Sequence, residues 1–262
     1  MTTAPENYFP RLAEFPHAAL FEGVAHVWEA IGALESYVRA ALELSGAAEV
    51  DLGELEGLRI DEGMVSSAGL FVAPETMMIA RVGVLIEKGV RIEPGVVVKG
   101  PTILCAGSEL RHGAYLRGRC LIGPHAIVGH ATEVKNSVFL EHAEAGHFAY
   151  VGDSFLGADS NLGAGTKLAN LQFRTEAEKR EKNVCHIEIR IDGKRIDTGL
   201  RKFGAIVGEH TEIGCNVVTS PGTLLGPGCW VVPNTTVSKG LYPANHLIRA
   251  GGGKPSVVLR KQ

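Results

Sequence analysis

The sequence "IEKGVRIEPGVVVKGPTILCAGSELRHGAYLRGRCLIGPHAIVGHATEVKNSVFL", residues 86–140, places an aliphatic residue at every sixth position. A six-residue period is too long for a helix turn, and the glycine or proline at many turn positions excludes a helical solenoid. Each hexad predicts a short strand and a turn, and stacked coils then bury a core that no single hexad buries. The series is Ile86, Ile92, Val98, Leu104, Leu110, Leu116, Ile122, Val128, Val134 and Leu140.

The phase of the repeat changes after Leu140. A second series from Tyr150 to Leu168 keeps the six-residue step, but Tyr150 stands ten positions after Leu140, which is no multiple of six. His147 lies in this first interruption, where a side chain is released from the inward pattern. A third series begins at Val207. The sequence therefore predicts a solenoid that is interrupted twice.

The second interruption, residues 171–204, contains the charged stretch "RTEAEKREKN" and an alternating segment around Asp192-Gly193 that predicts a β-hairpin with a two-residue turn. Ahead of the solenoid, apolar residues at helical spacing between Val24 and Leu42 predict an amphipathic helix. We expect this helix to cover the open end of the solenoid or to pack on a neighbouring subunit. The expected division is an N-terminal helical cap and linker, 1–78, a β-helix domain, 79–249, and a basic tail, 250–262.

Composition narrows the classes of partner. The net charge of -3, with 21% charged residues, gives no overall electrostatic footprint for nucleic acid or an anionic membrane. The N-terminal segment has no basic region followed by an apolar run, and no stretch is long enough to span a membrane, so we expect a cytoplasmic protein. Five cysteines without a CxxC pair argue against a disulfide framework and a zinc knuckle.

The repeat resembles the hexapeptide-repeat family, whose known form is an all-β solenoid, the left-handed parallel β-helix with three hexads per coil. The usual right-handed crossover rule predicts the opposite hand, so the hand is implied by the resemblance alone. The motifs "EVKN", "GHFAYVGD", "NLGAGT" and "RKFGAIVG", in this order, resemble the acetyltransferase half of the bifunctional enzymes that acetylate glucosamine-1-phosphate and then uridylate the product. The long loop before the last motif is similar to the archaeal form. This resemblance covers roughly residues 91–249.

The resemblance implies a site for an amino-sugar phosphate. His147, in the "GH" pair, corresponds to the general base that takes a proton from the sugar amine, and histidine titrates near neutral pH without special tuning. The same resemblance assigns Tyr150 and Lys135 to the amino-sugar phosphate and Lys202 to its phosphate. Arg111 corresponds to a phosphate-binding arginine, although one additional hexad separates it from Lys135 here. A whole hexad moves a residue to another side of the coil.

The resemblance also implies a site for acetyl-CoA as the co-substrate, with no metal required. Asn161 and Asn170 match asparagines that bind sugar and acyl groups. The backbone N–H of Ala164 matches the donor to the thioester oxygen, where charge develops in acyl transfer. The residues assigned to coenzyme A are Ala164, Cys215, Arg249 and Lys254.

Two departures from the family pattern affect the expected reaction. Leu171 stands where the bacterial family has a tyrosine, which removes one polar contact to the acceptor. No glycine-rich nucleotide loop precedes the repeat, so uridyl transfer by this chain is not expected and a separate nucleotidyltransferase is a candidate partner. The resemblance further implies a homotrimer, in which clefts between subunits hold the acyl donor.

Two other functions remain open on sequence alone. The first is a catalytically silent scaffold or sugar-phosphate-binding protein, which the missing nucleotidyltransferase half motivates. The second is a metalloenzyme similar to the γ-type carbonic anhydrases, which share this solenoid and use histidines five residues apart. His125 and His130 have this spacing, and so have His142 and His147. A metal site needs three converging protein ligands.

Overall fold

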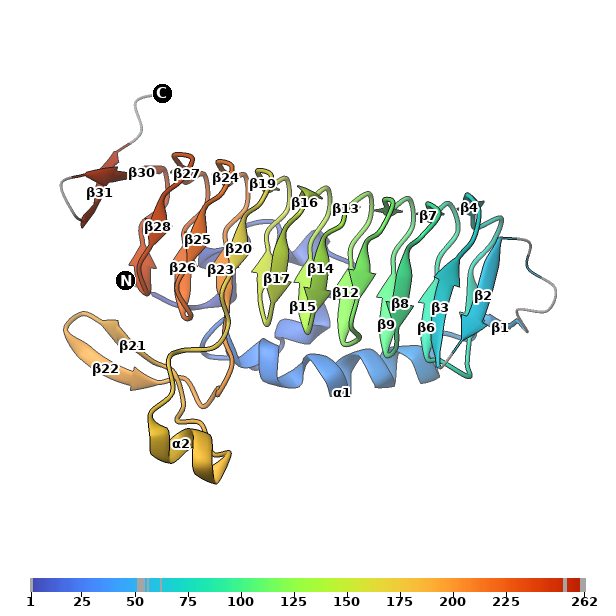
Figure 1. Ribbon diagram of the computed structural model, residues 1–262, viewed down its shortest axis with the longest axis horizontal. Helices are drawn as coiled ribbons and strands as arrows, with labels where there is room; N and C mark the ends of the chain where they lie inside the picture. Colours follow the sequence, from blue (N-terminus) through green and yellow to red (C-terminus); the bar gives the residue numbers. More distant parts are fainter. Residues whose placement is uncertain (1, 51–54, 56, 62, 252–253, 260–262) are drawn as a thin grey trace.

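Three parallel sheets wind around one hydrophobic core in the computed structural model, which describes residues 2–50, 55, 57–61, 63–251 and 254–259 (Figure 1). We name the sheets A, B and C. Sheet A comprises, in spatial order, β1 (Ala48–Glu49), β5 (Met77–Ile79), β6 (Val84–Ile86), β9 (Thr102–Leu104), β12 (Cys120–Ile122), β15 (Ser137–Phe139), β18 (Phe155–Leu156), β23 (Ala205–Val207), β26 (Thr223–Leu225) and β29 (Gly240–Tyr242).

The other two sheets complete the triangular cross-section. Sheet B comprises β2 (Leu58–Asp61), β3 (Met64–Ser67), β8 (Val97–Lys99), β11 (Tyr115–Leu116), β14 (Glu133–Lys135), β17 (Tyr150–Gly152), β20 (Lys167–Leu168), β25 (Val218–Thr219) and β28 (Thr236–Val237). Sheet C comprises β4 (Phe71–Val72), β7 (Arg91–Ile92), β10 (Glu109–Leu110), β13 (Ile127–His130), β16 (Glu144–His147), β19 (Asn161–Leu162), β24 (Glu212–Ile213), β27 (Trp230–Val231), β30 (His246–Gly251) and β31 (Lys254–Leu259).

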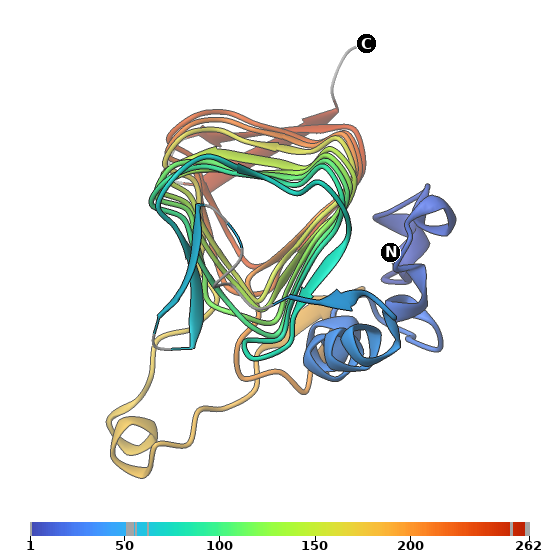
Figure 2. The same cartoon turned by 90° about the vertical axis from the view of Figure 1, so that its right-hand side faces the viewer.

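The solenoid is left-handed. Each coil passes from sheet A to sheet C and then to sheet B, as β6, β7 and β8 do. Figure 2 views the solenoid from its N-terminal end, with sheet A beside helix α1 (Glu29–Leu44), sheet C at the top and sheet B on the left. The path is counterclockwise as the coils recede, which is the left hand. The expected left-handed parallel β-helix is therefore confirmed.

Leu140 and Tyr150 differ from the sequence prediction, which placed both in the series of inward residues. Phe139 and Val151 occupy the inward positions and belong to the core cluster inside the coils. Leu140 packs instead in a second hydrophobic cluster on the outer side of sheet A. Tyr150 is half-buried and lies on the outer face of sheet B. The predicted inward position is thus wrong by one residue at the last member of the first series and at the first member of the second.

The coil becomes one residue shorter where the chain turns from sheet B to sheet A. Ile122 lies opposite Phe139, 17 positions later, which is one residue fewer than three hexads. Asn136 and Asp153 occupy the two shortened corners with φ angles of 48° and 49°. Short polar side chains tolerate this left-handed conformation better than most residues do. The strand that ends at His147 stays in register with the preceding coil, so the repeat does not break at the histidine.

Helix α1 lies along the side of the solenoid and not over its end (Figure 1). Its buried residues, including Leu34, join the outward residues of sheet A in the second hydrophobic cluster. Sheet A is therefore buried on both faces, which explains three-residue apolar strands such as β6, with Leu85 turned outward. The end itself is covered by antiparallel strands: β3 pairs with β8, β4 with β7 and β5 with β6. Three short 3₁₀ helices precede α1, at Pro5–Asn7, Leu12–Glu14 and Ala18–Phe21.

The insertion at 171–204 forms the expected hairpin, β21 (Glu188–Ile191) and β22 (Lys194–Asp197). Its turn residues Asp192 and Gly193 both have positive φ, as a tight hairpin turn requires. The charged stretch forms helix α2 (Glu176–Glu181), which Thr175 and Glu178 cap reciprocally. The expected basic tail contributes β31, which pairs with β30. Among the described residues no helix is long and apolar enough to cross a membrane.

Candidate functional site

A buried carboxylate organises the corner between sheets B and A. Asp153 is 4% exposed. Its carboxylate accepts hydrogen bonds from Lys135 Nζ at 3.4 Å, from Asn136 Nδ2 at 2.9 Å and from Asn170 Nδ2. Its backbone carbonyl also accepts the N–H of Gly204 at 2.8 Å, where the chain returns from the insertion. Two predicted substrate residues, Lys135 and Asn170, are therefore held by Asp153, which is not among the predicted site residues.

The Tyr150 hydroxyl lies beside this cluster, directly above Gly152. A Cβ atom on Gly152 would lie 2.6 Å from the Tyr150 hydroxyl oxygen and 2.7 Å from Asn170 Nδ2. The absence of a side chain at Gly152 therefore allows Tyr150 and Asn170 to meet above the sheet. Burial raises the pKa of Tyr150 and the Asp153 carboxylate raises it further, against a hydrogen bond from Asn170 that lowers it. The phenol is accordingly a hydrogen-bonding group at neutral pH.

Positive charges gather around the same corner. Burial lowers the pKa of Lys135, and Lys202 and Arg119 lower it further, while Asp153 opposes them. Lys202 is exposed and stands just before the chain resumes sheet A. One carboxylate thus faces several cations, which is an arrangement that favours an added anion.

Arg111 does not reach this cluster within the chain. It follows β10 on sheet C, and its Nε lies 3.2 Å from Glu109 Oε1. Lys135 lies on sheet B, because the additional hexad moves Arg111 to a different side of the coil. Arg117 occupies the position equivalent to Lys135 in the preceding coil, since its N–H bonds to the carbonyl of Val134, and Arg119 also acts on the Lys135 ammonium group. Arg117 stands 18 positions before Lys135, one regular coil, and this spacing was the available sequence signal.

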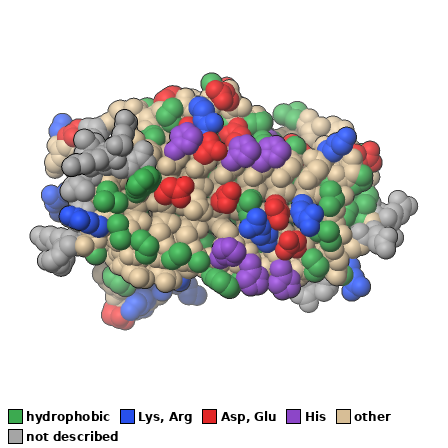
Figure 3. Space-filling view, turned by 90° about the horizontal axis from the view of Figure 1, so that it is seen from above, with side chains coloured by type: hydrophobic (Ala, Val, Ile, Leu, Met, Phe, Trp, Pro, Cys, Tyr) green, Lys and Arg blue, Asp and Glu red, His purple; other side chains and the backbone are tan. Residues whose placement is uncertain are grey.

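His147 lies at the other edge of sheet B, where the chain turns from sheet C. Its side chain is exposed, and it continues a column of histidines at this corner in which His112 and His130 stack with ring centroids 5.5 Å apart. The next coil places Ala164 in the same column, because the Gly165 N–H donates to the His147 carbonyl at 3.0 Å. Among the described residues, the N–H of Ala164 has no hydrogen-bond acceptor. Figure 3 shows the histidines in two rows along the edges of sheet C.

A groove of about 420 Å³ lies on sheet C beyond this corner. Asn161 lines it and donates to Glu212 Oε2 at 3.1 Å, and exposed Cys215 and the partly exposed Trp230 line it as well. Arg249 lies on β30 of the same sheet. The backbone of Lys254 begins β31, but its side chain is outside the described part of the structure.

The predicted residues therefore divide into two groups on either side of one corner. The face of sheet B carries Tyr150, Lys135 and Asn170, with Lys202 beside them. The face of sheet C carries the groove and Arg249. His147 and Ala164 lie at the corner between the two faces. Arg111 is the predicted substrate residue that the structure leaves apart from this arrangement.

The histidine pairs with five-residue spacing do not converge. His125 and His142 stack at the corner between sheets A and C, with ring centroids 5.1 Å apart. His130 and His147 lie at the opposite edge of sheet C. Five residues of extended strand span roughly 16 Å, so neither pair binds one ion within a single chain. The geometry gives the carbonic-anhydrase-like alternative no support within the chain.

Comparison with known proteins finds bifunctional proteins among the relatives of this chain. The chain is 38% identical over 112 residues to the bifunctional sugar-1-phosphate nucleotidylyltransferase/acetyltransferase of Sulfurisphaera tokodaii, which is 43% of this chain and 26% of that protein. It is 33% identical over 107 residues to the bifunctional protein GlmU of Methanocaldococcus jannaschii, 41% of this chain and 24% of the relative. The matched region thus spans about a quarter of each relative. No family model matches the sequence.

Comparison with solved structures also finds an acyltransferase and an acetyltransferase. The UDP-N-acetylglucosamine acyltransferase of Francisella novicida has a TM-score of 0.47 at 11% identity, covering 71% of this chain and 67% of that chain. The polysialic acid acetyltransferase NeuO has a TM-score of 0.44 at 14% identity, covering 66% of this chain and 77% of that one. The predicted resemblance to hexapeptide-repeat acyltransferases is confirmed by the sequence relatives.

Proposed function

From the premise that this chain is a hexapeptide-repeat β-helix homologous to acetyltransferase-containing sugar-1-phosphate enzymes, we propose that it is an acetyl-CoA-dependent N-acetyltransferase. The proposed acceptor is an amino-sugar phosphate, such as glucosamine-1-phosphate, or a nucleotide-linked amino sugar. One observation carries this proposal: Lys135, Tyr150 and Asn170 converge around the buried carboxylate of Asp153, on the face that His147 borders.

The face of sheet B suits a phosphorylated sugar. Lys135 and Lys202 supply positive charge, and Arg117 lies in register with Lys135 in the preceding coil. Arg117 Nη1 lies 2.7 Å from Glu133 Oε1, an exposed pair that a phosphate dianion can open at small cost. Asn170 and Tyr150 offer an amide and a hydroxyl to the sugar hydroxyls. We assign the phosphate to Lys135, Lys202 and Arg117.

His147 is the proposed general base. The sugar amine attacks the thioester carbonyl carbon, the new C–N bond forms, and an imidazole nitrogen of His147 takes one amine proton. The carbonyl oxygen gains negative charge, which the N–H of Ala164 stabilises in the proposed geometry. The C–S bond then breaks, and coenzyme A leaves as a thiol after it receives a proton.

The groove on sheet C is the proposed site of acetyl-CoA. Trp230 and Cys215 give it an apolar wall, and Asn161 gives it a polar group for the acyl amide. Arg249 on the same sheet is the proposed partner of a coenzyme A phosphate, together with Lys254. A donor bound on sheet C and an acceptor bound on sheet B would then meet at the corner that carries His147 and Ala164.

We propose that a homotrimer completes this cleft. Helix α1 covers sheet A, so the outer faces of sheets B and C are those left for neighbouring subunits. Phe148, directly after His147, is 56% exposed, and Trp230 is 44% exposed. Heterologous contacts between such faces close a threefold ring in the proposed assembly, because the two faces meet at the edge of a triangular prism. The product, an N-acetylated sugar phosphate, is a substrate for nucleotidyl transfer by a separate protein.

A thiol-release assay tests the activity. Acetyl-CoA is supplied with glucosamine-1-phosphate, galactosamine-1-phosphate or UDP-linked amino sugars, and the native protein is compared with His147→Ala. We expect turnover with one acceptor and a loss of about 10²–10⁴-fold in kcat for His147→Ala, with little change in acceptor binding.

His130→Ala is the matched control, because His130 occupies the same corner one coil earlier. It should keep native turnover. Equal turnover of native protein and His147→Ala would remove His147 as the base. Binding of a sugar phosphate by folded protein without turnover of any acceptor would support the catalytically silent binding protein instead.

A further inference from the structure

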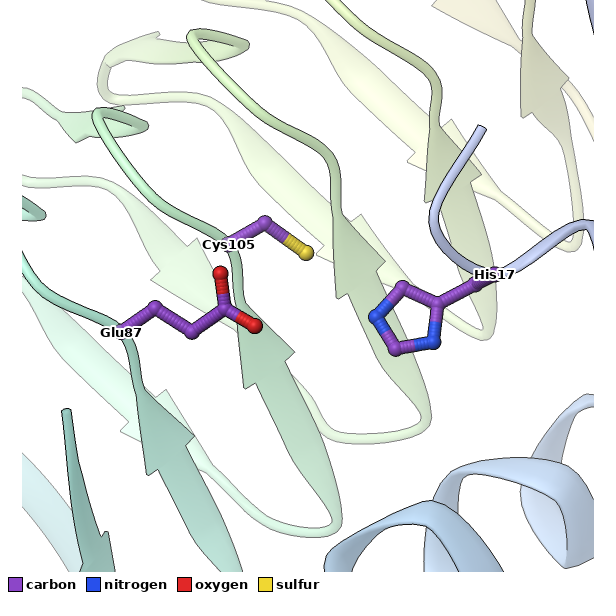
Figure 4. Close-up of side chains that lie close together, drawn as sticks. All are labelled: His17, Glu87 and Cys105. Atoms are coloured by element: carbon purple, nitrogen blue, oxygen red, sulfur yellow. The ribbon is translucent and has the colours of Figure 1, made fainter. Parts of the chain in front are cut away.

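Three side chains of different chemistry meet where the N-terminal segment crosses sheet A (Figure 4). His17 lies between the second and third 3₁₀ helices, Glu87 directly follows β6, and Cys105 directly follows β9. One potential ligand atom from each residue lies within 4.8 Å of the other two. This cluster is far from the corner that carries His147, and the proposed acetyl transfer uses none of its members.

The solenoid itself places two of the three residues. The N–H of Glu87 donates to the carbonyl of Leu104, and the N–H of Cys105 donates to the carbonyl of Ile122, so Glu87 and Cys105 occupy equivalent positions in successive coils. Their side chains therefore leave the same edge of sheet A one above the other. His17 arrives from a segment that is distant in sequence and faces both of them (Figure 4).

His17 and Glu87 each use one polar atom in a hydrogen bond outside the cluster, and the other polar atom remains for a ligand at its centre. His17 Nδ1 lies 2.9 Å from the hydroxyl of Tyr37 on α1, and Figure 4 shows the other ring nitrogen turned toward Glu87 and Cys105. Glu87 Oε2 accepts the N–H of Ala106 at 2.8 Å, which leaves Oε1 available. A hydrogen-bonded second nitrogen is the usual way in which a metal-binding histidine is oriented.

The surroundings of Cys105 argue against a catalytic thiol and favour a bound cation. Cys105 is 1% exposed, so no substrate reaches its sulfur. A divalent cation between the thiolate and the Glu87 carboxylate would balance both charges, with neutral imidazole as the third ligand.

We propose that His17 Nε2, Glu87 Oε1 and Cys105 Sγ bind a structural zinc ion that fastens the N-terminal segment to the solenoid. Nitrogen, sulfur and oxygen donors together suit Zn²⁺ and not Mg²⁺ or Ca²⁺, which take oxygen ligands. The Zn–S bond forms as the S–H bond breaks, and the thiol proton passes to solvent. Ligands around tetrahedral zinc stand about 3–4 Å apart, so small side-chain rotations close the site, and water takes the fourth position.

Cobalt binding tests the site without reference to activity. The full-length protein is freed of metal with a chelator and titrated with Co²⁺, and the thiolate-to-cobalt charge-transfer band in the near ultraviolet is recorded. We expect one Co²⁺ per chain, displaced by Zn²⁺. Cys105→Ser should lose the band. Cys185→Ser, which removes an exposed thiol on the insertion, should keep it.

Two further variants keep the test decisive if Cys105→Ser fails to fold. His17→Gln should weaken Co²⁺ binding strongly, and Tyr37→Phe, which removes the partner of Nδ1, should weaken it about 10- to 100-fold. Zn²⁺ should raise the melting temperature of the native protein and not that of His17→Gln. Absence of the band in the native protein, or its loss in Cys185→Ser alone, would overturn the proposal. Neither outcome bears on acetyl transfer.

Discussion

At the scale of single residues, the site depends on Asp153. It stands at a shortened corner, in a backbone conformation that aspartate tolerates, and its carboxylate binds both Lys135 and Asn170. The carboxylate is nearly buried, so its charge acts at short range on both partners. Asp153 fixes the direction of the Lys135 ammonium group, which is proposed to bind the phosphate of the acceptor. Asp153 is thus a positioning residue.

Gly152 provides the sharpest residue-level test of the acceptor site. Gly152→Ala places a methyl group within 2.6 Å of the Tyr150 hydroxyl and should displace both Tyr150 and Asn170. We expect at least about a tenfold fall in kcat/KM for the amino-sugar phosphate, since misplaced positioning groups cost this much or more. The thiol-release assay measures the effect.

Gly146→Ala is the control for that substitution. Gly146 directly precedes His147, yet an added Cβ there meets no atom within 4 Å in the described structure. This variant should keep native kinetics. A native kcat/KM for both alanine variants would show that Tyr150 and Asn170 do not contact the acceptor.

At the scale of elements, the sheets differ in what covers them. Sheet A is apolar on both faces, because the coils cover one and α1 with the 3₁₀ segments covers the other. Fully burying each outward aliphatic residue, such as Ile103, contributes about 1.5–3 kcal/mol. Sheets B and C alternate inward apolar residues with outward residues of mixed polarity, and these outer faces carry the candidate site. The insertion adds a hairpin beside β29 and a short helix with no buried residue.

The short helix α2 should depend on pH through Glu178. The N–H groups of Cys185 and Thr175 bond its carboxylate and lower the pKa of Glu178 from 4.5 to about 2. A folded-state pKa below the unfolded value means that the contribution of this carboxylate is complete above about pH 4.5. It is lost as the pH falls toward about 2. The amide NMR shifts of Cys185 and Thr175 should move together in this range.

Glu178→Gln is the matched variant for that titration. It keeps the shape of the cap but removes the charge, so the coupled shift of the two amides should disappear. A midpoint near 4.5 in the native protein would show that the cap does not form in solution.

At the scale of the whole molecule, large apolar side chains are exposed on the faces that helices leave open. Phe148 lies at the corner beside His147, Leu171 follows β20, and Trp230 and Val232 border the groove on sheet C. Exposed apolar groups on adjacent faces of one prism are typical of a subunit contact. In the proposed trimer these residues would enclose the acyl donor and exclude water.

Phe148→Asp tests the assembly. A carboxylate at a buried interface position should shift the protein from trimer to monomer in sedimentation equilibrium at micromolar concentration, because its desolvation is not compensated. Leu44→Asp is the control, since Leu44 is 85% exposed at the end of α1, on the covered side of the solenoid. A native protein that sediments as a monomer at these concentrations would contradict the proposed trimer.

The sequence by itself determined the repeat, the parallel solenoid and the hairpin at Asp192-Gly193. Inward periodicity and turn chemistry are local properties, and each hexad carries them without reference to the rest of the chain. The resemblance added the left hand and a set of site residues. In the structure these residues lie on two faces of one corner, except for Arg111, which lies apart, and Lys254, whose side chain is outside the described residues.

Only the tertiary structure decided which residues face inward at the first interruption itself, where Phe139 and Val151 take the places predicted for Leu140 and Tyr150. Their direction depends on the hydrogen-bond register between successive coils, and a corner that is one residue shorter changes that register. The same is true of α1, whose apolar face matches the end or the side of a solenoid equally well. Helix α1 lies on the side because its apolar face packs there against the outward apolar residues of sheet A.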